Sequence, residues 1–117
     1  MKRTIIAAAL FAATPALANP PGYDSSWTSK EAADAAIAAD HAYTECLFQH
    51  LRDYGRKTKD PARDVVEAAH GACWLEREKL LAAMHKAQPT WESDWLNKRD
   101  KEVELDEMSI VMESRSN

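Results

Sequence analysis

Two stretches of the chain carry apolar or small residues at helical spacing, and a short polar segment separates them. The first runs from Glu31 to Tyr54 without proline or glycine, and the second from Pro61 to about Ala87. Apolar positions that recur every three or four residues predict helices with one inward face. Because the connection is short, the two helices are expected to lie antiparallel.

The residues at the ends of these stretches predict where each helix begins and stops. Thr28 followed by Glu31 three residues later fits a capping box, which makes Thr28 the expected N-cap. Gly55 is expected to end the first helix. Asp60 before Pro61 is expected to cap the second, because proline is favoured at the first helical position.

A third helix is predicted in the C-terminal part of the chain. Thr90 is its expected cap, and Leu96, Val103 and Ile110 keep a seven-residue spacing. Some of the apolar residues there also alternate as in a strand. We expect a helix as far as Met108 or beyond, followed by fraying.

The N-terminus has the pattern of a cleavable signal peptide over residues 1–18: a basic start, a short apolar run and an Ala-x-Ala site. The pattern divides the rest into a single helical domain over 19–112, with an extended lead-in at 19–28, and a disordered tail at 113–117. We expect a periplasmic or secreted protein, with no stable membrane insertion after cleavage.

The charge balance argues against a nucleic-acid partner. The formal net charge is -4, and it becomes more negative once the basic signal is removed. Nucleic-acid binding needs a dominant basic face, whereas the basic cluster here is local and interrupted by aspartates, as in a solvated turn. Its members are Arg52, Arg56, Lys57, Lys59 and Arg63.

The only two cysteines, Cys46 and Cys73, lie on the two predicted hairpin helices. In an exported chain without a Cys-x-x-Cys motif they predict a structural disulfide, which would stabilise the fold by roughly 3–4 kcal/mol. Gly71 beside them is expected to allow a close approach of backbones. The predicted fold is all-α: a disulfide-stapled antiparallel helical hairpin with a third C-terminal helix packed on it.

A metal site is the alternative use of the cysteines. His50 follows Cys46 by four residues and His70 precedes Cys73 by three, so all four side chains can gather near one face of the hairpin. Two cysteines and two histidines are a ligand set that zinc accepts. The disulfide is the preferred interpretation, and we expect no cofactor.

Catalytic motifs do not support an enzyme. No serine lies in a Gly-x-Ser-x-Gly turn, and a disulfide would consume both cysteines. The acidic run near the C-terminus is interpreted as a solvated helix face, because no apolar pocket is evident to shift a carboxylate pKa. The run comprises Asp100, Glu102, Glu104, Asp106 and Glu107.

Tryptophan is abundant, with four residues in the chain. Trp74 is expected to lie toward the third helix, where Trp91 and Trp95 could meet it. These indoles either hold the third helix on the hairpin or form an exposed patch that binds a partner. They are the candidate partner-binding residues, and the expected partner is a protein of the cell envelope.

The pattern Tyr43-x-x-Cys46-Leu47 followed by Ala72-Cys73-x-x-Glu76-Arg77 resembles that of small exported Cys-pair helical proteins of Gram-negative bacteria. The resemblance covers only the hairpin and implies no activity. We expect a non-catalytic binding or structural role in the periplasm. An acid-stress holdase chaperone and a Cys₂His₂ metal-binding protein are the alternatives.

Overall fold

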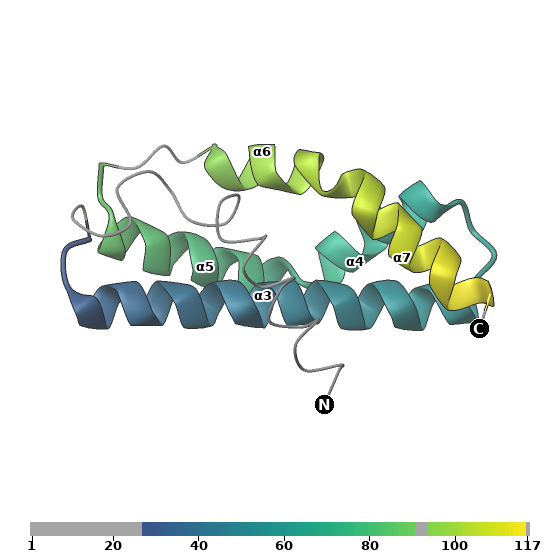
Figure 1. Cartoon of the computed structure of the whole chain (residues 1–117), viewed down its shortest axis with the longest axis horizontal. Helices are drawn as coiled ribbons and strands as arrows, with labels where there is room; N and C mark the ends of the chain where they lie inside the picture. The colour runs from purple at the N-terminus through teal and green to yellow at the C-terminus, as the bar shows by residue number, and fades with distance from the viewer. Residues whose placement is uncertain (1–26, 91–93, 117) are drawn as a thin grey trace, which may run out of the picture.

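The computed structural model describes residues 27–90 and 94–116, and these residues are helical throughout except for short connections. Figure 1 shows the elements in order along the chain. They are α3 (Lys30–Lys57), α4 (Ala62–Ala72), α5 (Trp74–Ala87), α6 (Trp95–Glu102) and α7 (Glu104–Ser116). The all-α prediction is confirmed for this part of the chain.

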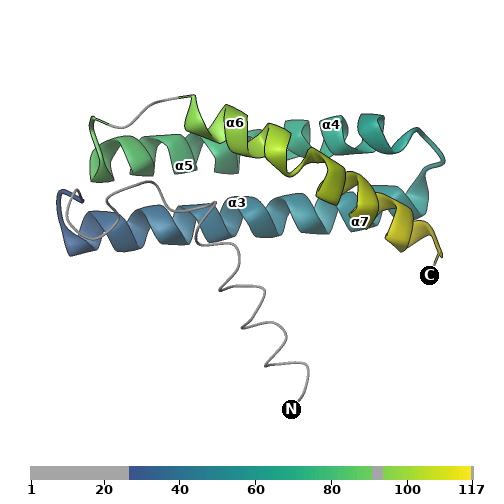
Figure 2. The same ribbon diagram turned by 45° about the horizontal axis from the view of Figure 1, so that its top comes forward.

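The long helix α3 is the base on which the other helices lie. α4 and α5 return along it in the opposite direction, and α7 packs on both α3 and α4 (Figures 1 and 2). The C-terminal helices run in the same direction as α3, since Tyr43 bonds Asp100 and, further along both, Gly55 bonds Arg115. The hairpin is therefore antiparallel, and the C-terminal segment crosses back over it.

The core lies where α3 meets the other helices. Its largest fully buried side chains include one aromatic ring and several aliphatic groups. They are Tyr43, Leu51, Leu80, Leu96 and Val111. Residues of α3, α5, α6 and α7 thus share one apolar interior, so the third helical segment is part of the core.

The first helix begins one residue later than the capping box predicted. Ser29 is the N-cap, and its Oγ accepts a hydrogen bond from the backbone N–H of Ala32 at 3.0 Å. Thr28 bonds another part of the chain, because its N–H donates to the carbonyl of Ala87 and its hydroxyl to that of Lys86. Thr28 therefore satisfies the free carbonyls at the end of α5.

Gly55 does not end α3, which continues to Lys57. It is buried, and a Cβ built on it would overlap Ser114 Oγ and lie 3.0 Å from the carbonyl oxygen of Val111. The absence of a side chain therefore lets α7 approach α3 closely. Gly71 was expected to have this role, but that expectation is wrong, because a Cβ there would meet nothing within 4 Å.

The second predicted helix is divided at Cys73, which has φ -100° and ψ 18° and separates α4 from α5. Hydrogen bonds from Cys73 N to Ala69 O and from Arg77 N to Cys73 O carry the helical path across the break. At the other end, α4 begins after Pro61 without a side-chain cap, so the predicted capping role of Asp60 is not observed. Local geometry at the bridge thus interrupts a helix that periodicity predicts as continuous.

The third predicted helix is also divided, with Val103 between α6 and α7. The predicted tail differs from the structure, because residues 113–116 complete α7 and Ser114 is buried. The proposed cap at Thr90 borders residues 91–93, which lie outside the described part, as does Asn117. The strand-like alternation has no counterpart, since α7 is helical over its whole length.

The signal peptide at 1–18 and most of the lead-in at 19–28 also lie outside the described residues. Within the described ranges, none of the helices combines the length and the apolar character that crossing a bilayer requires.

Candidate functional site

The predicted disulfide is confirmed and links the middle of α3 to the break between α4 and α5. Cys46 and Cys73 have a Cα–Cα distance of 5.9 Å. Cys73 is fully buried, whereas Cys46 is partly exposed. The bridge therefore has an interior side and a side that faces solvent.

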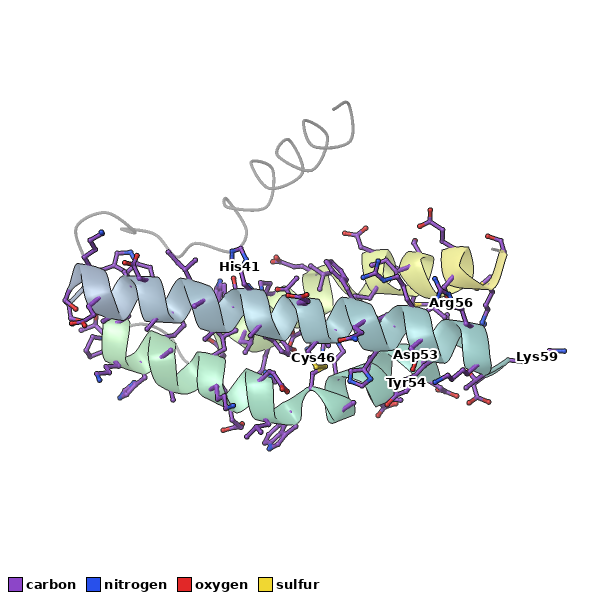
Figure 3. All side chains as sticks on the ribbon, turned by 90° about the horizontal axis from the view of Figure 1, so that it is seen from below. His41, Cys46, Asp53, Tyr54, Arg56 and Lys59 are labelled. Atoms are coloured by element: carbon purple, nitrogen blue, oxygen red, sulfur yellow. A yellow bond between two sulfur atoms is a disulfide. The ribbon has the colours of Figure 1, made fainter. Side chains whose placement is uncertain are left out.

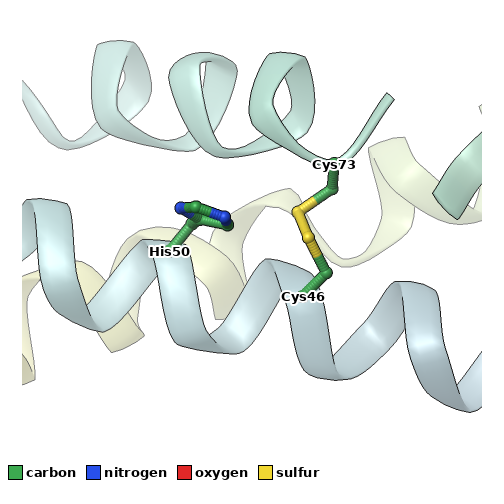
Figure 4. A group of neighbouring side chains, drawn as sticks. All are labelled: Cys46, His50 and Cys73. Carbon is green, nitrogen blue, oxygen red and sulfur yellow. A yellow bond between two sulfur atoms is a disulfide. The ribbon is translucent and has the colours of Figure 1, made fainter. Parts of the chain in front are cut away.

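One of the two predicted histidine ligands lies beside the bridge. Figure 4 shows His50 next to Cys46 and Cys73, on the same face of α3 as Cys46. A ring nitrogen of His50 and the two sulfur atoms all lie within 4.8 Å of one another. His70, the fourth member of the predicted metal set, is held elsewhere by other partners.

His70 belongs to a group of polar side chains between the hairpin and the C-terminal helices, which we call the polar clamp. Its members come from all five described helices: Tyr43, His70, Arg77, Asp100 and Glu107. The shortest contact joins His70 Nε2 to Glu107 Oε2 at 2.9 Å. The other ring nitrogen, Nδ1, lies 3.1 Å from the Tyr43 hydroxyl oxygen, which lies 3.2 Å from both carboxylate oxygens of Asp100.

The number of protons in this chain of contacts indicates a doubly protonated His70. The Tyr43 hydroxyl has one proton and donates it to Asp100, so its oxygen accepts from His70 Nδ1. The other nitrogen donates to the carboxylate of Glu107. An imidazolium satisfies both contacts at once, and the hydrogen bond that His70 donates to Glu107 raises the pKa of His70 against the opposing effect of burial.

The charges of the polar clamp balance. Glu107 faces His70, while Asp100 accepts from Arg77 Nε at 3.4 Å. Burial and the neighbouring Asp100 raise the pKa of the Tyr43 phenol above its usual value, so this hydroxyl keeps its proton. Two cations and two anions therefore neutralise one another around a neutral phenol.

The position of the polar clamp makes it a connection between helices. Glu107 is only 3% exposed and is the buried residue through which α7 reaches α4. Because both nitrogens of His70 are engaged as donors, neither lone pair is available to accept a substrate proton. The arrangement is suited to holding the C-terminal helices on the hairpin.

Two arginines add further connections. Arg99 pairs with Asp40 of α3 at 2.7 Å and stacks over the Trp95 ring, with its guanidinium carbon 4.6 Å from the ring centroid. Arg115, near the C-terminus, donates to the backbone carbonyls of Gly55 and Asp60. The second of these connects α7 with the turn before α4.

The tryptophans do not form one group within the described residues. Trp95 is partly buried against the core, consistent with a role in holding the third helical segment. Trp74 is 58% exposed, and its neighbour Leu75 is 60% exposed. Trp91 lies outside the described residues. Of the two candidate partner-binding residues that the structure describes, Trp74 is the more exposed.

The basic cluster lies at the end of the hairpin, as the sequence predicts. Figure 3 shows Arg56 and Lys59 there, with Asp53 and Tyr54 on the preceding turns of α3. Lys57 bonds Asp53 at 3.0 Å, with the two side chains 70% and 47% exposed. The exposure of these groups agrees with the prediction of a solvated turn.

The carboxylates of the polar clamp were missed by the sequence interpretation, which placed the whole acidic run on a solvated face. Glu102 and Asp106 are exposed, but Asp100 is partly buried and Glu107 fully so. Asp100 and Glu107 are seven residues apart, the same spacing as Leu96 and Val103. This common seven-residue spacing could have predicted that the two carboxylates lie on the same inward face as the apolar residues.

Comparison of the chain with protein-family models, with curated proteins and with solved structures finds no match.

Proposed function

We propose that the protein acts without catalysis in the periplasm, as a small helical binding protein whose contact surface is centred on Trp74 and Leu75. The observation that carries this proposal is the exposure of these two adjacent large apolar side chains, at 58% and 60%. A disulfide and the signal-like N-terminus support an oxidising compartment outside the cytoplasm.

The position of Trp74 favours a contact role. It is the first residue of α5 and directly follows the buried, disulfide-bonded Cys73, so its backbone is held in place. A rigidly anchored tryptophan loses little conformational entropy on binding, and tryptophan is enriched among the residues that dominate interface energies. The polar clamp supports the non-catalytic part of the proposal, because its histidine has no free lone pair.

A site-directed photocrosslinking experiment tests this surface. A photoreactive amino acid at Glu78, one helical turn after Trp74 and exposed, should give a discrete crosslinked product in the periplasm of producing cells. The Trp74→Ala, Leu75→Ala double variant should lose that product while keeping the unfolding midpoint of the parent. A product that survives the double substitution would contradict the proposal.

A second candidate function, an acid-responsive holdase, is favoured by the composition of the polar clamp. Protonation of Glu107 and Asp100 in strong acid would leave His70 and Arg77 as two cations without counter-charges between the helices. Release of α6 and α7 would then uncover apolar core residues such as Leu51. Such a surface could hold unfolding clients.

The holdase function is tested by near-ultraviolet circular dichroism and client aggregation at pH 2.5 and pH 7. We expect loss of tertiary signal and suppression of client aggregation only at the lower pH. The Trp74→Ala, Leu75→Ala variant separates the two functions, since it should impair the contact surface but leave the acid response intact. An unchanged tertiary signal at pH 2.5 would rule out this candidate.

A further inference from the structure

The side chains around the disulfide form a three-ligand set. Cys46 and His50 are one helical turn apart on α3 and therefore point the same way. Cys73 faces them from the break between α4 and α5, and the three potential ligand atoms lie within 4.8 Å of one another (Figure 4). An ion with bonds of about 2.3 Å to sulfur and 2.0 Å to nitrogen needs the histidine nitrogen about 1 Å nearer to the sulfurs. It also needs the two sulfurs, which are bonded to each other here, to separate.

His50, unlike His70, has ring nitrogens that are available to bind an ion. Its ring packs against Tyr54, with centroids 5.2 Å apart and planes tilted by 50°, and within the described residues neither nitrogen has a hydrogen-bond partner. His50 is partly exposed and lines an open depression with Gln49 and Asp53, which gives an ion a route to the site. Both nitrogens of His70, in contrast, are occupied in the polar clamp.

The disulfide prevents metal binding in the present state, because thiolates are the ligands and both sulfurs are bonded to each other. We propose that the bridge conceals a redox-gated site for a thiophilic d¹⁰ cation, formed by Cys46, His50 and Cys73. Two thiolates and one imidazole suit Cu(I) and Zn²⁺, and the softness of the sulfur ligands favours Cu(I). The proposal goes beyond the binding function and is independent of the Trp74 surface.

The gating step is a thiol–disulfide exchange with a dithiol reductant. The dithiol gives two electrons and two protons: its own sulfurs become a disulfide, the bond between Cys46 and Cys73 breaks, and two thiols form. Binding of the cation then releases the two thiol protons to water. The solvent-facing side of the bridge, at the partly exposed Cys46, is where the reductant's thiolate attacks.

A metal titration of the full chain in its two redox states tests the proposal. Protein reduced with a phosphine and desalted without oxygen is titrated with Cu(I) against bicinchoninate, and with Zn²⁺ against a pyridylazo indicator. We expect one equivalent to bind the reduced form and none to bind the oxidised form. Stronger retention of Zn²⁺ than of Cu(I) would overturn the assigned preference, and equal binding by both redox states would overturn the site.

Substitution of the histidine separates this site from simple thiol binding. His50→Ala should lower the affinity of the reduced protein for the preferred ion by 10- to 100-fold, because one of three ligands is lost. His85→Ala, which removes an exposed histidine of α5, should leave it unchanged. Equal affinities of the His50 variant and the parent would overturn the assignment.

The folding of the reduced chain is followed in the same samples by far-ultraviolet circular dichroism. If reduction alone lowers helix content, one equivalent of the ion should restore it in the parent and not in the His50→Ala variant. Failure of the ion to restore helix in the parent would also refute the site.

Discussion

The contact between His70 and Glu107 allows a quantitative test of the polar clamp. Glu107→Gln keeps the size of the side chain and an accepting oxygen but removes the charge that faces His70. A hydrogen bond between charged groups contributes about 1.5–3 kcal/mol, compared with about 1 kcal/mol for a neutral one. Because Glu107 is 3% exposed and lies 2.9 Å from His70, we expect the free energy of unfolding to fall by about 1–2 kcal/mol at pH 6.

The size of this loss should depend on pH in a defined direction. Glu107 raises the pKa of His70 above its ordinary value of 6.5. The pair therefore contributes fully below that value, and its contribution is lost as the pH rises through the higher pKa of the folded state. The difference between the parent and Glu107→Gln should be larger at pH 6 than at pH 9.

Urea unfolding followed by circular dichroism measures both quantities. Glu104→Gln is the matched control on the same helix, because Glu104 pairs with Arg63 at 3.5 Å between side chains that are 39% and 74% exposed. An exposed pair of this kind should change stability by less than about 0.5 kcal/mol. The reasoning is refuted if the two variants behave alike at pH 6, or if the loss in Glu107→Gln is the same at both pH values.

Three further predictions concern the rest of the core. Gly55→Ala should lower the free energy of unfolding by about 1–3 kcal/mol, because the added methyl group overpacks against α7. Gly71→Ala should raise it by up to about 1 kcal/mol, because alanine has the higher helix propensity. Urea midpoints that move in the same direction in both variants would contradict this pair of predictions. Tyr43→Phe should cost about 1–2 kcal/mol, because the hydroxyl links the histidine and the aspartate of the polar clamp, and a midpoint equal to that of the parent would show that this link is dispensable. Reduction of the disulfide should cost roughly 3–4 kcal/mol, measured by unfolding with and without a phosphine, and an unchanged midpoint would indicate that the bridge adds no stability.

The hairpin was predictable because its determinants are local. The apolar spacing in residues 31–54 and 61–87 was sufficient for two helices, and the oxidisable pair of cysteines fixed their pairing. Its details depended on partners distant in sequence. Thr28 has the side chain of an N-cap, but the nearby end of α5 has free carbonyls that it bonds, and Ser29 takes the capping position.

The third helical segment was less predictable because its inward face mixes apolar residues with charged ones. Asp100 and Glu107 interrupt the apolar pattern, and a charged residue on an inward face is indistinguishable from a solvated one until its partners are known. Those partners are on other helices, at His70 and Arg77. The role of Gly55 was not predictable for the same reason, because the residue that packs against it, Ser114, is distant in the sequence.

The position of the disulfide also influences the order in which the chain can fold. The disulfide joins residues separated by 27 positions, whereas the contact between Tyr43 and Asp100 joins residues 57 positions apart. Once the disulfide has formed, Tyr43 and Asp100 are also connected through Cys46 and Cys73. This connection is little more than half as long as the uninterrupted chain between them. Since each halving of a closing loop lowers its entropic cost by about 0.6 kcal/mol, the oxidised hairpin is a better template for the last-synthesised helices than the reduced one. Oxidation before docking should therefore be the faster route to the native state.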